Sequence, residues 1–131
     1  MKIKDLLSQR MLRAEVADTP IKCEKGLMFR NKLEDDGGML FVFDSPRKLN
    51  FWGRNTYIPL DIAFVSDNNT ILKISNISPL NLKSISSDEN CIMAIETNYN
   101  YFKNNRIKVG DKVKIDNSDQ NIALISFEGN I

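Results

Sequence analysis

Histidine is absent from the 131 residues of this chain. Without an imidazole, the chain cannot by itself perform Ser-His-Asp or Cys-His nucleophilic catalysis. Zinc and non-haem iron sites that depend on histidine are excluded for the same reason. Any acid–base chemistry would have to use carboxylates, lysine or tyrosine. We predict neither a metal site nor a cofactor.

Cysteine is scarce, because Cys23 and Cys91 are the two in the chain. They lie far apart in the sequence and have no metal-ligand spacing. We interpret both as half-buried free thiols, the usual state of isolated cysteines. A disulfide between them is the alternative, and it would require an oxidising compartment.

Long apolar runs are also missing. No segment approaches the ~20 apolar residues of a membrane-spanning helix. The first twelve residues, MKIKDLLSQRML, contain no apolar run longer than two residues, whereas a secretory signal peptide needs a longer apolar core. We therefore predict a cytoplasmic protein without a membrane span, although a chain trimmed of its leader would look the same.

Neither charge sign is in excess, since the chain has 18 Lys and Arg residues and 17 Asp and Glu residues. Nucleic-acid-binding proteins usually have a strong basic excess, so we expect no nucleic-acid partner. The 42% hydrophobic content is typical of a packed domain. A chain of this length forms one ordinary domain without a metal or disulfide, and we predict a single domain over 1–131 with an N-terminal arm at 1–10.

Short apolar or alternating segments separated by turn residues indicate β-strands. The expected strands are 11–17, 39–43, 48–56, 59–65, 70–77, 91–96, 112–115 and 122–127. Asp18-Thr19-Pro20 predicts the start of a helix over 21–29, docked through Ile21, Leu27 and Met28. The pattern predicts a mainly β domain, a β-sandwich or small barrel-like fold, with one or two short helices.

Turns and loops complete this prediction. Residues 34–38 and 44–47 are expected to be turns, with Gly37 and Gly38 supplying positive φ. Residues 78–90 are expected to form the longest loop, and 97–105 a second short helix. Gly53, inside an expected strand, indicates a bulge or a close backbone approach.

Five segments occur in a recognisable order: EVADTP at 15–20, GLMFR at 26–30, GMLFVFDSPR at 38–47, FWGRNTYIPLDIAF at 51–64 and IKVGDKV at 107–113. Over about residues 12–116, this series resembles the family called domain of unknown function 192. The resemblance implies a compact β-sandwich-like domain and almost no function, because the family's activity is not established.

The chain departs from the family pattern in two places. The family usually has Met-Lys after the tryptophan, where this chain has Gly53-Arg54. A glycine there is expected to open a pocket or loosen the strand. The family also tends to place a glycine after the glutamate-containing strand, where this chain reads Glu96 to Tyr101 without one. The turn at that point is expected to be built differently.

Polar side chains next to apolar strand residues are the candidate ligand site. They are Arg30, Trp52, Arg54, Asn55, Thr56 and Asp61. The indole offers a stacking surface, the amide and hydroxyl offer hydrogen bonds, and an arginine offers an anion contact. This mixture suits a small polar ligand such as a sugar or a carboxylate.

The same residues also permit a purely structural interpretation. In it, Arg30 and Asp61 form an internal ion pair, and Asn55 and Thr56 satisfy backbone groups of a turn. Trp52 then fills the core. Polar networks that hold a turn in place are common in folded domains.

Three functions follow as hypotheses. We favour a non-catalytic binding or accessory module for a small polar ligand. The second is a carboxylate-dependent hydrolase or lyase on a saccharide, in which Asp61 pairs with Asp18 or Glu96 at about 5–9.5 Å. The third is a structural or protein-interaction domain that docks a partner through a sheet edge or an aromatic patch. The sequence does not specify the ligand, the partner or the oligomeric state.

Overall fold

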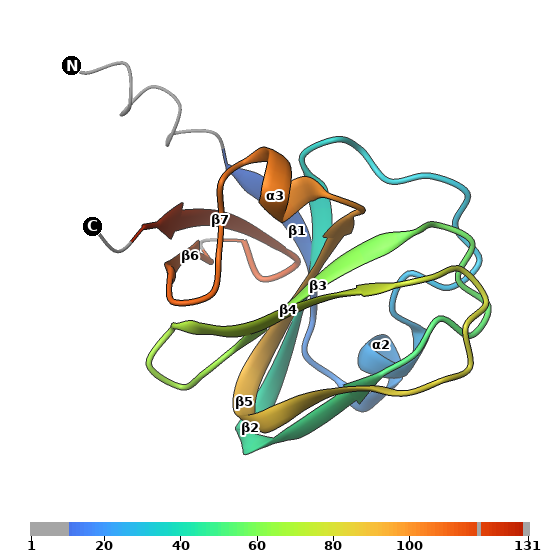
Figure 1. The fold of residues 1–131 in the computed structure, drawn as a ribbon, viewed down its shortest axis with the longest axis horizontal. Coiled ribbons are helices and arrows are strands. Elements are labelled where there is room, and N and C mark those ends of the chain that lie inside the picture. The colour runs from blue at the N-terminus through green and yellow to red at the C-terminus, as the bar shows by residue number, and fades with distance from the viewer. Residues whose placement is uncertain (1–10, 118, 130–131) are drawn as a thin grey trace.

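The computed structural model describes residues 11–117 and 119–129. Seven strands form one curled sheet with two short helices (Figure 1). The elements are β1 (Leu12–Ala17), α2 (Pro20–Lys25), β2 (Gly37–Phe51), β3 (Leu60–Val65), β4 (Ile71–Ile77), β5 (Ile85–Asn98), α3 (Tyr101–Asn104), β6 (Lys112–Asp116) and β7 (Ile122–Glu128). The predicted mainly β fold with short helices is confirmed. The N-terminal arm predicted at 1–10 lies outside the described residues.

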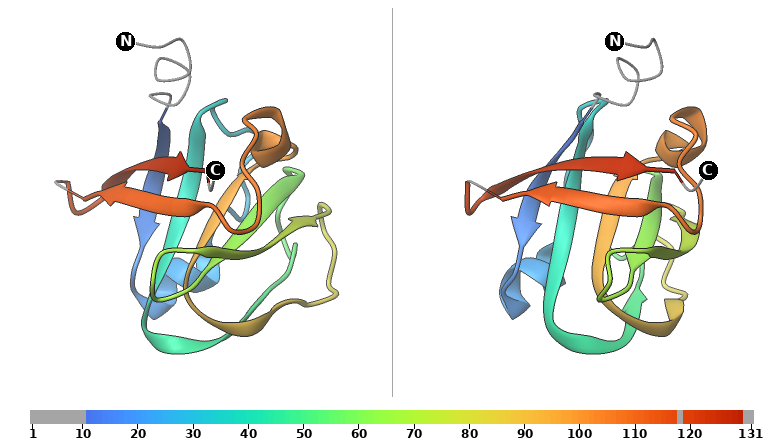
Figure 2. Two further views of the ribbon diagram at one scale, coloured as in Figure 1. Left: turned by 60° about the vertical axis from the view of Figure 1, so that its left-hand side comes forward. Right: turned by 90° about the vertical axis from the view of Figure 1, so that its left-hand side faces the viewer.

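The sheet runs in the order β4-β3-β5-β2-β1-β7-β6. β1 pairs in parallel with β2 and antiparallel with β7. A parallel pair requires a crossover connection, which α2 and residues 26–36 provide. Figure 2 shows the β6–β7 hairpin running across β1 and β2, which curls the sheet. Within the described ranges, no helix has the length and apolar character needed to cross a bilayer.

The two edge strands of the curled sheet meet at one end. The N–H of Ile71 donates to the carbonyl of Asp111 at 2.9 Å, and the N–H of Gly110 donates back to Ile71 at 2.8 Å. The N–H of Val113 donates to Asn69 at 2.8 Å. These bonds join the starts of β4 and β6, so the sheet forms a half-barrel that is closed at this end.

Each face of the sheet covers its own apolar core. The barrel core lies inside the curl, because it takes side chains from all seven strands, among them Leu12, Leu40, Ala63, Ile71, Ile95, Val113 and Ala123. The flank core lies on the other face and includes Leu27, Met39, Phe41, Leu60, Ile62, Phe64 and Ala94. Alternation along β3 therefore sends Leu60, Ile62 and Phe64 into the flank core and Ala63 and Val65 into the barrel core.

β2 and β5 are much longer than the sequence suggests. The expected turn at 44–47 is wrong, because these residues belong to β2 at a register shift between Val42 and Arg47. The expected loop at 78–90 is also too long, since β5 begins at Ile85 and pairs there with Phe51. β2 ends at Phe51 rather than at residue 56. The pairing of β2 with β5 stops at Val42 and resumes at Arg47, so the turn signals at 44–47 produce an irregularity within β2 rather than its end.

The first helix begins where the sequence predicts and ends early. The N–H of Lys22 donates to the Thr19 hydroxyl at 3.2 Å, and Pro20 occupies the first turn. Gly26 ends the helix with φ +48° and lies against Phe41. Leu27 docks into the flank core, but Ile21 is 79% exposed, so its predicted docking is wrong.

The adjacent glycines of β2 serve close packing rather than a positive φ. Neither Gly37 nor Gly38 has a positive φ, so that prediction is wrong. A Cβ on Gly38 would lie 2.5 Å from the carbonyl oxygen of Glu96. Glycine therefore allows β2 and β5 to approach each other at this point.

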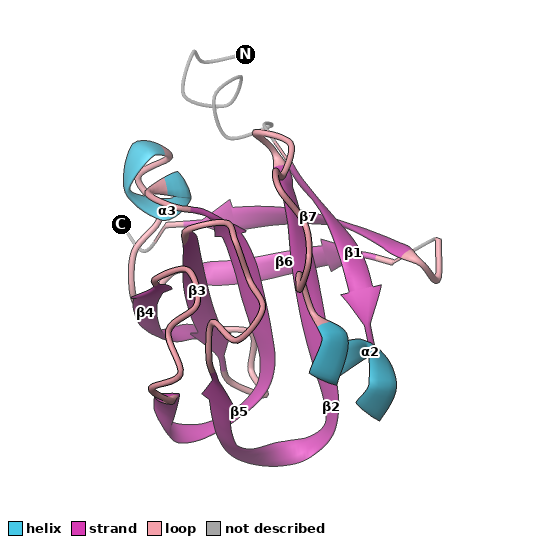
Figure 3. Cartoon of the chain, turned by 90° about the vertical axis from the view of Figure 1, so that its right-hand side faces the viewer, coloured by secondary structure: helices cyan, strands magenta, loops and turns pink. Residues whose placement is uncertain are grey.

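The second helix is shorter than the predicted 97–105, because β5 extends to Asn98 and α3 spans Tyr101–Asn104. Figure 3 shows α2 beside β2 and α3 on the other side of the molecule, next to β3. Tyr101 and Phe102 are buried in the barrel core. Cys23 and Cys91 are free thiols, as expected.

Candidate functional site

Four of the six candidate residues lie around two adjoining hollows, while Arg30 and Asp61 lie elsewhere. The first hollow, here called the aromatic pocket, has a volume of about 250 Å³ and is lined by Met28, Phe41, Phe51, Trp52, Thr56 and Glu96, among others. The second, the surface shelf, is lined by Ile21, Met28, Phe29, Trp52, Arg54 and Asn55, among others. Met28 and Trp52 border both hollows.

Glu96 is the unusual residue of the aromatic pocket. It is 5% exposed, and within the described part of the chain its carboxyl has no hydrogen-bond or ion-pair partner. Burial raises the pKa of Glu96 from 4.5 to about 8. At neutral pH the carboxyl is therefore mainly protonated and offers one donor and one acceptor to the pocket.

Strand register brings Glu96 into this position. It pairs with Met39 of β2 on one side and with Ile62 of β3 on the other. Directly opposed residues of antiparallel strands project from the same face of a sheet, so Glu96 projects into the flank core. The sequence names Glu96 as a possible partner of Asp61, but local pattern gives no sign that it lies opposite Trp52 and α2.

The remainder of the pocket wall is aromatic and firmly packed. The rings of Phe41 and Phe51 contact edge to face with centroids 4.9 Å apart. Trp52 is 44% exposed, so the structural interpretation in which it fills the core is wrong. The guanidinium of Arg54 lies 5.6 Å from the Trp52 ring centroid. Trp52 and Arg54 thus stack at the mouth of the pocket.

Three of the seven described non-glycine residues with positive φ lie near the mouth of the pocket. Phe29 has φ +67° and Asn55 has φ +54°, and the Phe29 N–H donates to the Asn55 carbonyl at 2.7 Å. A positive φ is rare for a bulky aromatic residue and costs on the order of 1–3 kcal/mol. The N–H of Leu80, with φ +62°, donates to the Thr56 carbonyl at 3.0 Å. Such strained residues tend to cluster at ligand sites.

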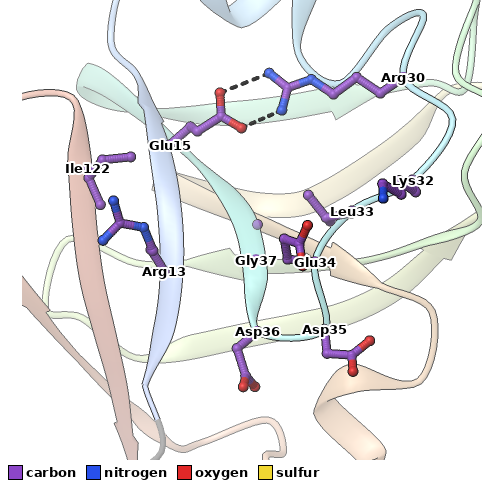
Figure 4. Close-up of a pocket in the computed structure, with 11 residues that line it drawn as sticks. Arg13, Glu15, Arg30, Lys32, Leu33, Glu34, Asp35, Asp36, Gly37 and Ile122 are labelled. Carbon is purple, nitrogen blue, oxygen red and sulfur yellow. Dashed lines mark hydrogen bonds and ion pairs between the residues drawn. The ribbon is translucent and has the colours of Figure 1, made fainter.

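Arg30 lies in a separate charged groove (Figure 4). The groove has a volume of about 550 Å³ and is lined by Arg13, Glu15, Arg30, Lys32, Asp35 and Asp36, among others. Arg30 makes a bidentate pair with Glu15, in which Nη2 donates to Oε1 at 2.9 Å. This bond from Arg30 holds the pKa of Glu15 below its usual value.

The charged groove is the larger hollow but the poorer candidate site. Its acids and bases are exposed or half-buried, and Arg30 already has its carboxylate partner. Water and counter-ions solvate such groups in the absence of a ligand. Among the described residues, none of the charged side chains that line the groove is buried.

Asp61 holds the turn between β5 and α3. Its buried carboxylate accepts hydrogen bonds from the backbone N–H groups of Asn100 and Phe102. Burial raises the pKa of Asp61, and the two hydrogen bonds partly offset that rise. The expected Arg30–Asp61 ion pair does not form, because each residue has a different partner.

Neither predicted carboxylate pair has the geometry for glycoside chemistry. Asp61 is opposite Thr97 and Glu96 is opposite Ile62, so the two carboxyls leave opposite faces of the sheet. Asp18 follows the end of β1, which is separated from β3 by β2 and β5. Three strand spacings amount to about 14 Å, beyond the ~5–9.5 Å that the reaction requires.

Comparison with known proteins places the chain in a family. The family model of domain of unknown function 192 (DUF192), described as uncharacterized ACR, matches residues 3–115. The chain belongs to the DUF192 family. No curated protein matches it.

Solved structures similar to this DUF192 chain include one from each of two bacteria. One, from Sinorhizobium meliloti 1021, is described as a candidate transcription regulator. It is 36% identical with a TM-score of 0.74, over 76% of this chain and 78% of that one. The other, from Novosphingobium aromaticivorans DSM 12444, is described as a protein of unknown function. It is 37% identical with a TM-score of 0.75, over 77% of this chain and 73% of that one.

The two departures from the DUF192 pattern have clear structural settings. Gly53 lies just after β2, and its N–H donates to the Asn81 carbonyl at 2.7 Å. A Cβ at this position would collide with the carbonyl oxygen of Ser78, so the expected close backbone approach is confirmed. At the second departure, residues 96–101, Asn100 adopts φ +68° just before α3. Asparagine tolerates this conformation better than most residues.

Proposed function

We propose that this DUF192 chain is a non-catalytic binding module whose site is the aromatic pocket with the adjoining surface shelf. A small ligand would enter beside Trp52 and Arg54 and reach Glu96 at the buried end. Asn55 and Thr56 would flank its path. Arg30 and Asp61 have no part in this proposal, because their side chains are engaged elsewhere.

The observation that carries the proposal is the Glu96 carboxyl, which is 5% exposed, lines the pocket and has no side-chain hydrogen bond or ion pair to the other described residues. A buried polar group without a partner costs about 1–3 kcal/mol, so folded proteins retain few of them. A ligand that hydrogen-bonds Glu96 would remove this cost. The aromatic wall supports the proposal, since small-molecule sites combine apolar walls with a few polar groups.

A fragment screen on the full ¹⁵N-labelled chain tests the proposal. We expect hits to shift the amide signals of Leu27, Thr56 and Glu96. Trp52→Ala should weaken the hits about tenfold, because it removes a stacking wall. Tyr99→Ala is the matched control, since Tyr99 is 51% exposed and lies at the end of β5 near α3. Hits confined to the charged groove, or no hits at all, would refute the proposal.

A protein partner is the second candidate, because apolar side chains surround the pocket mouth. Ile21, Phe29, Trp52 and Tyr57 are exposed, and the rings of Phe29 and Tyr57 lie 6.4 Å apart. Exposed apolar groups gathered in one place often mark an interaction surface. Binding of a protein with no small-molecule hit would favour this function. A cytoplasmic location stays a prediction from the sequence.

A further inference from the structure

The protonation state of Glu96 restricts the class of ligand that the aromatic pocket can bind. Desolvation is the cause of its raised pKa, and no charged neighbour contributes. The titratable groups that share the pocket are Cys23, Glu24 and Lys25 of α2. A protonated carboxyl presents a donor O–H and an acceptor C=O side by side. An uncharged ligand group matches this carboxyl best when it carries a hydrogen-bond acceptor and a hydrogen-bond donor at the same spacing.

The walls and size of the pocket favour a flat ring. Phe41, Phe51 and Trp52 supply aromatic surfaces and Met28 an adaptable thioether. A cavity of about 150 Å³ is enough to hold benzene. The 250 Å³ here accommodates one ring with a short polar substituent.

Charged ligands fit this pocket poorly. The guanidinium of Arg47 lies 4.8 Å from the Phe43 ring centroid and that of Arg54 lies 5.6 Å from the Trp52 ring centroid, so a cationic ligand would approach rings that already face cations. Lys25 of α2 adds a further positive charge beside the pocket. An anion would have to lose its water against apolar walls, which is costly.

We propose that the aromatic pocket selects an uncharged planar ring bearing an amide or lactam group, which forms paired hydrogen bonds with the Glu96 carboxyl. The amide carbonyl accepts from the carboxyl O–H, and the amide N–H donates to the carboxyl C=O. The ring lies among Phe41, Phe51 and Trp52. This inference rests on the binding function proposed above and specifies its ligand class.

Benzamide is the probe, with benzylammonium, benzoate and toluene as matched ring compounds. Titration of the full ¹⁵N-labelled chain at pH 6.5 should give the tightest binding for benzamide, with shifts at Leu27, Thr56 and Glu96. Between pH 7 and pH 9 its affinity should fall about tenfold, because ionisation of Glu96 removes the donor. Benzamide itself does not titrate in this range, so the change reports on the protein.

Two variants of Glu96 separate the contribution of hydrogen bonding to benzamide affinity from that of the shape of the pocket. Glu96→Gln keeps a donor and an acceptor, so benzamide should still bind, and its affinity should no longer depend on pH between 7 and 9. Glu96→Leu should reduce binding at least tenfold. If the leucine variant does not fold, the pH dependence lost in Glu96→Gln still tests the inference. Glu89→Gln is the control, because Glu89 is an exposed residue of β5 outside the lining of the pocket and the shelf, and it should leave both affinity and pH dependence unchanged.

The outcomes distinguish this inference from the proposed function. Tighter binding of benzylammonium or benzoate at the same residues would overturn the amide class and leave the binding module intact. The same holds if toluene binds as well as benzamide or if affinity is independent of pH. Failure of every small molecule to shift the pocket residues would overturn the binding module as well.

Discussion

The charged groove and the aromatic pocket each contain a glutamate from a β-strand, and the two glutamates have opposite surroundings. Glu15 lies partly in water and is paired with Arg30, which lowers its pKa. Glu96 is 5% exposed, and this burial raises its pKa to about 8. The comparison teaches that cavity volume and the number of charges do not identify a binding site. A largely buried polar side chain that lines a pocket does, because a ligand gains most by pairing with it.

The largest expected effect comes from removing a wall of the pocket. Phe41 is 1% exposed and contacts Phe51, so Phe41→Ala should lower the free energy of unfolding by about 3–5 kcal/mol. Leu33→Ala, in the half-buried wall of the charged groove, should cost about 1–2 kcal/mol. Urea unfolding of both variants measures the difference. Equal losses would show that the pocket wall is no more firmly packed than the groove.

Glu96→Gln should stabilise the protein in a pH-dependent way. The folded state keeps the Glu96 proton up to about pH 8, whereas the unfolded chain releases it near 4.5. Stability contributed by the bound proton is complete below about pH 4.5 and is lost as the pH rises to about 8. The variant should match the parent at pH 4 and exceed it by a few kcal/mol at pH 8. Thermal unfolding from pH 4 to 9 checks this, and parallel curves would contradict it.

Asp61 is a third carboxyl for comparison. It is buried like that of Glu96, but it accepts hydrogen bonds from backbone N–H groups. Asp61→Ala should cost about 1–3 kcal/mol, because the N–H groups of Asn100 and Phe102 lose their acceptor. Asp61→Asn keeps one oxygen and should cost less. Hydrogen exchange at the Asn100 and Phe102 amides provides the local measurement. Unchanged exchange in Asp61→Ala would show that the carboxylate does not hold this turn.

The smallest effect is expected at Glu15. Its side chain is 43% exposed, so solvent screening limits the pair with Arg30, and Glu15→Gln should cost only about 0.5 kcal/mol at pH 7. The lowered pKa means that this contribution is present above the ordinary carboxyl pKa and is lost as the pH falls through the folded-state value. Raising the salt concentration to 1 M should shrink the effect. A loss above 2 kcal/mol that resists salt would place Glu15 in a dry environment.

The sequence predicted the parts of the fold that depend on local signals. Thr19 and Pro20 mark the start of α2, and the strand expected at 59–65 matches β3. The limits of β2 and β5 were missed because residues 44–47 resemble a turn. In the structure, β2 pairs with β5 on both sides of these residues, which form an irregularity within the strand. Such pairing lies beyond what a local window contains.

The candidate site was predictable only in part, because some of its residues come from segments that are distant in the sequence. The segment from Trp52 to Thr56 is continuous, so its residues stay near one another in the structure. Arg30 and Asp61 were grouped with them by residue type alone, and they lie elsewhere. Glu96 is brought to Trp52 by strand register and by the crossover through α2. Neither feature has a signature near Glu96 in the sequence.

The most direct test of the account is a pH titration of the glutamate side-chain carboxyl carbons by ¹³C NMR, comparing Glu96 with Glu15 in the ligand-free 131-residue chain. The account predicts a midpoint near 8 for Glu96 and one below 4.5 for Glu15. Similar midpoints near 4.5 for both residues would contradict it, because Glu96 would then be an ordinary solvated carboxylate with nothing to gain from a ligand.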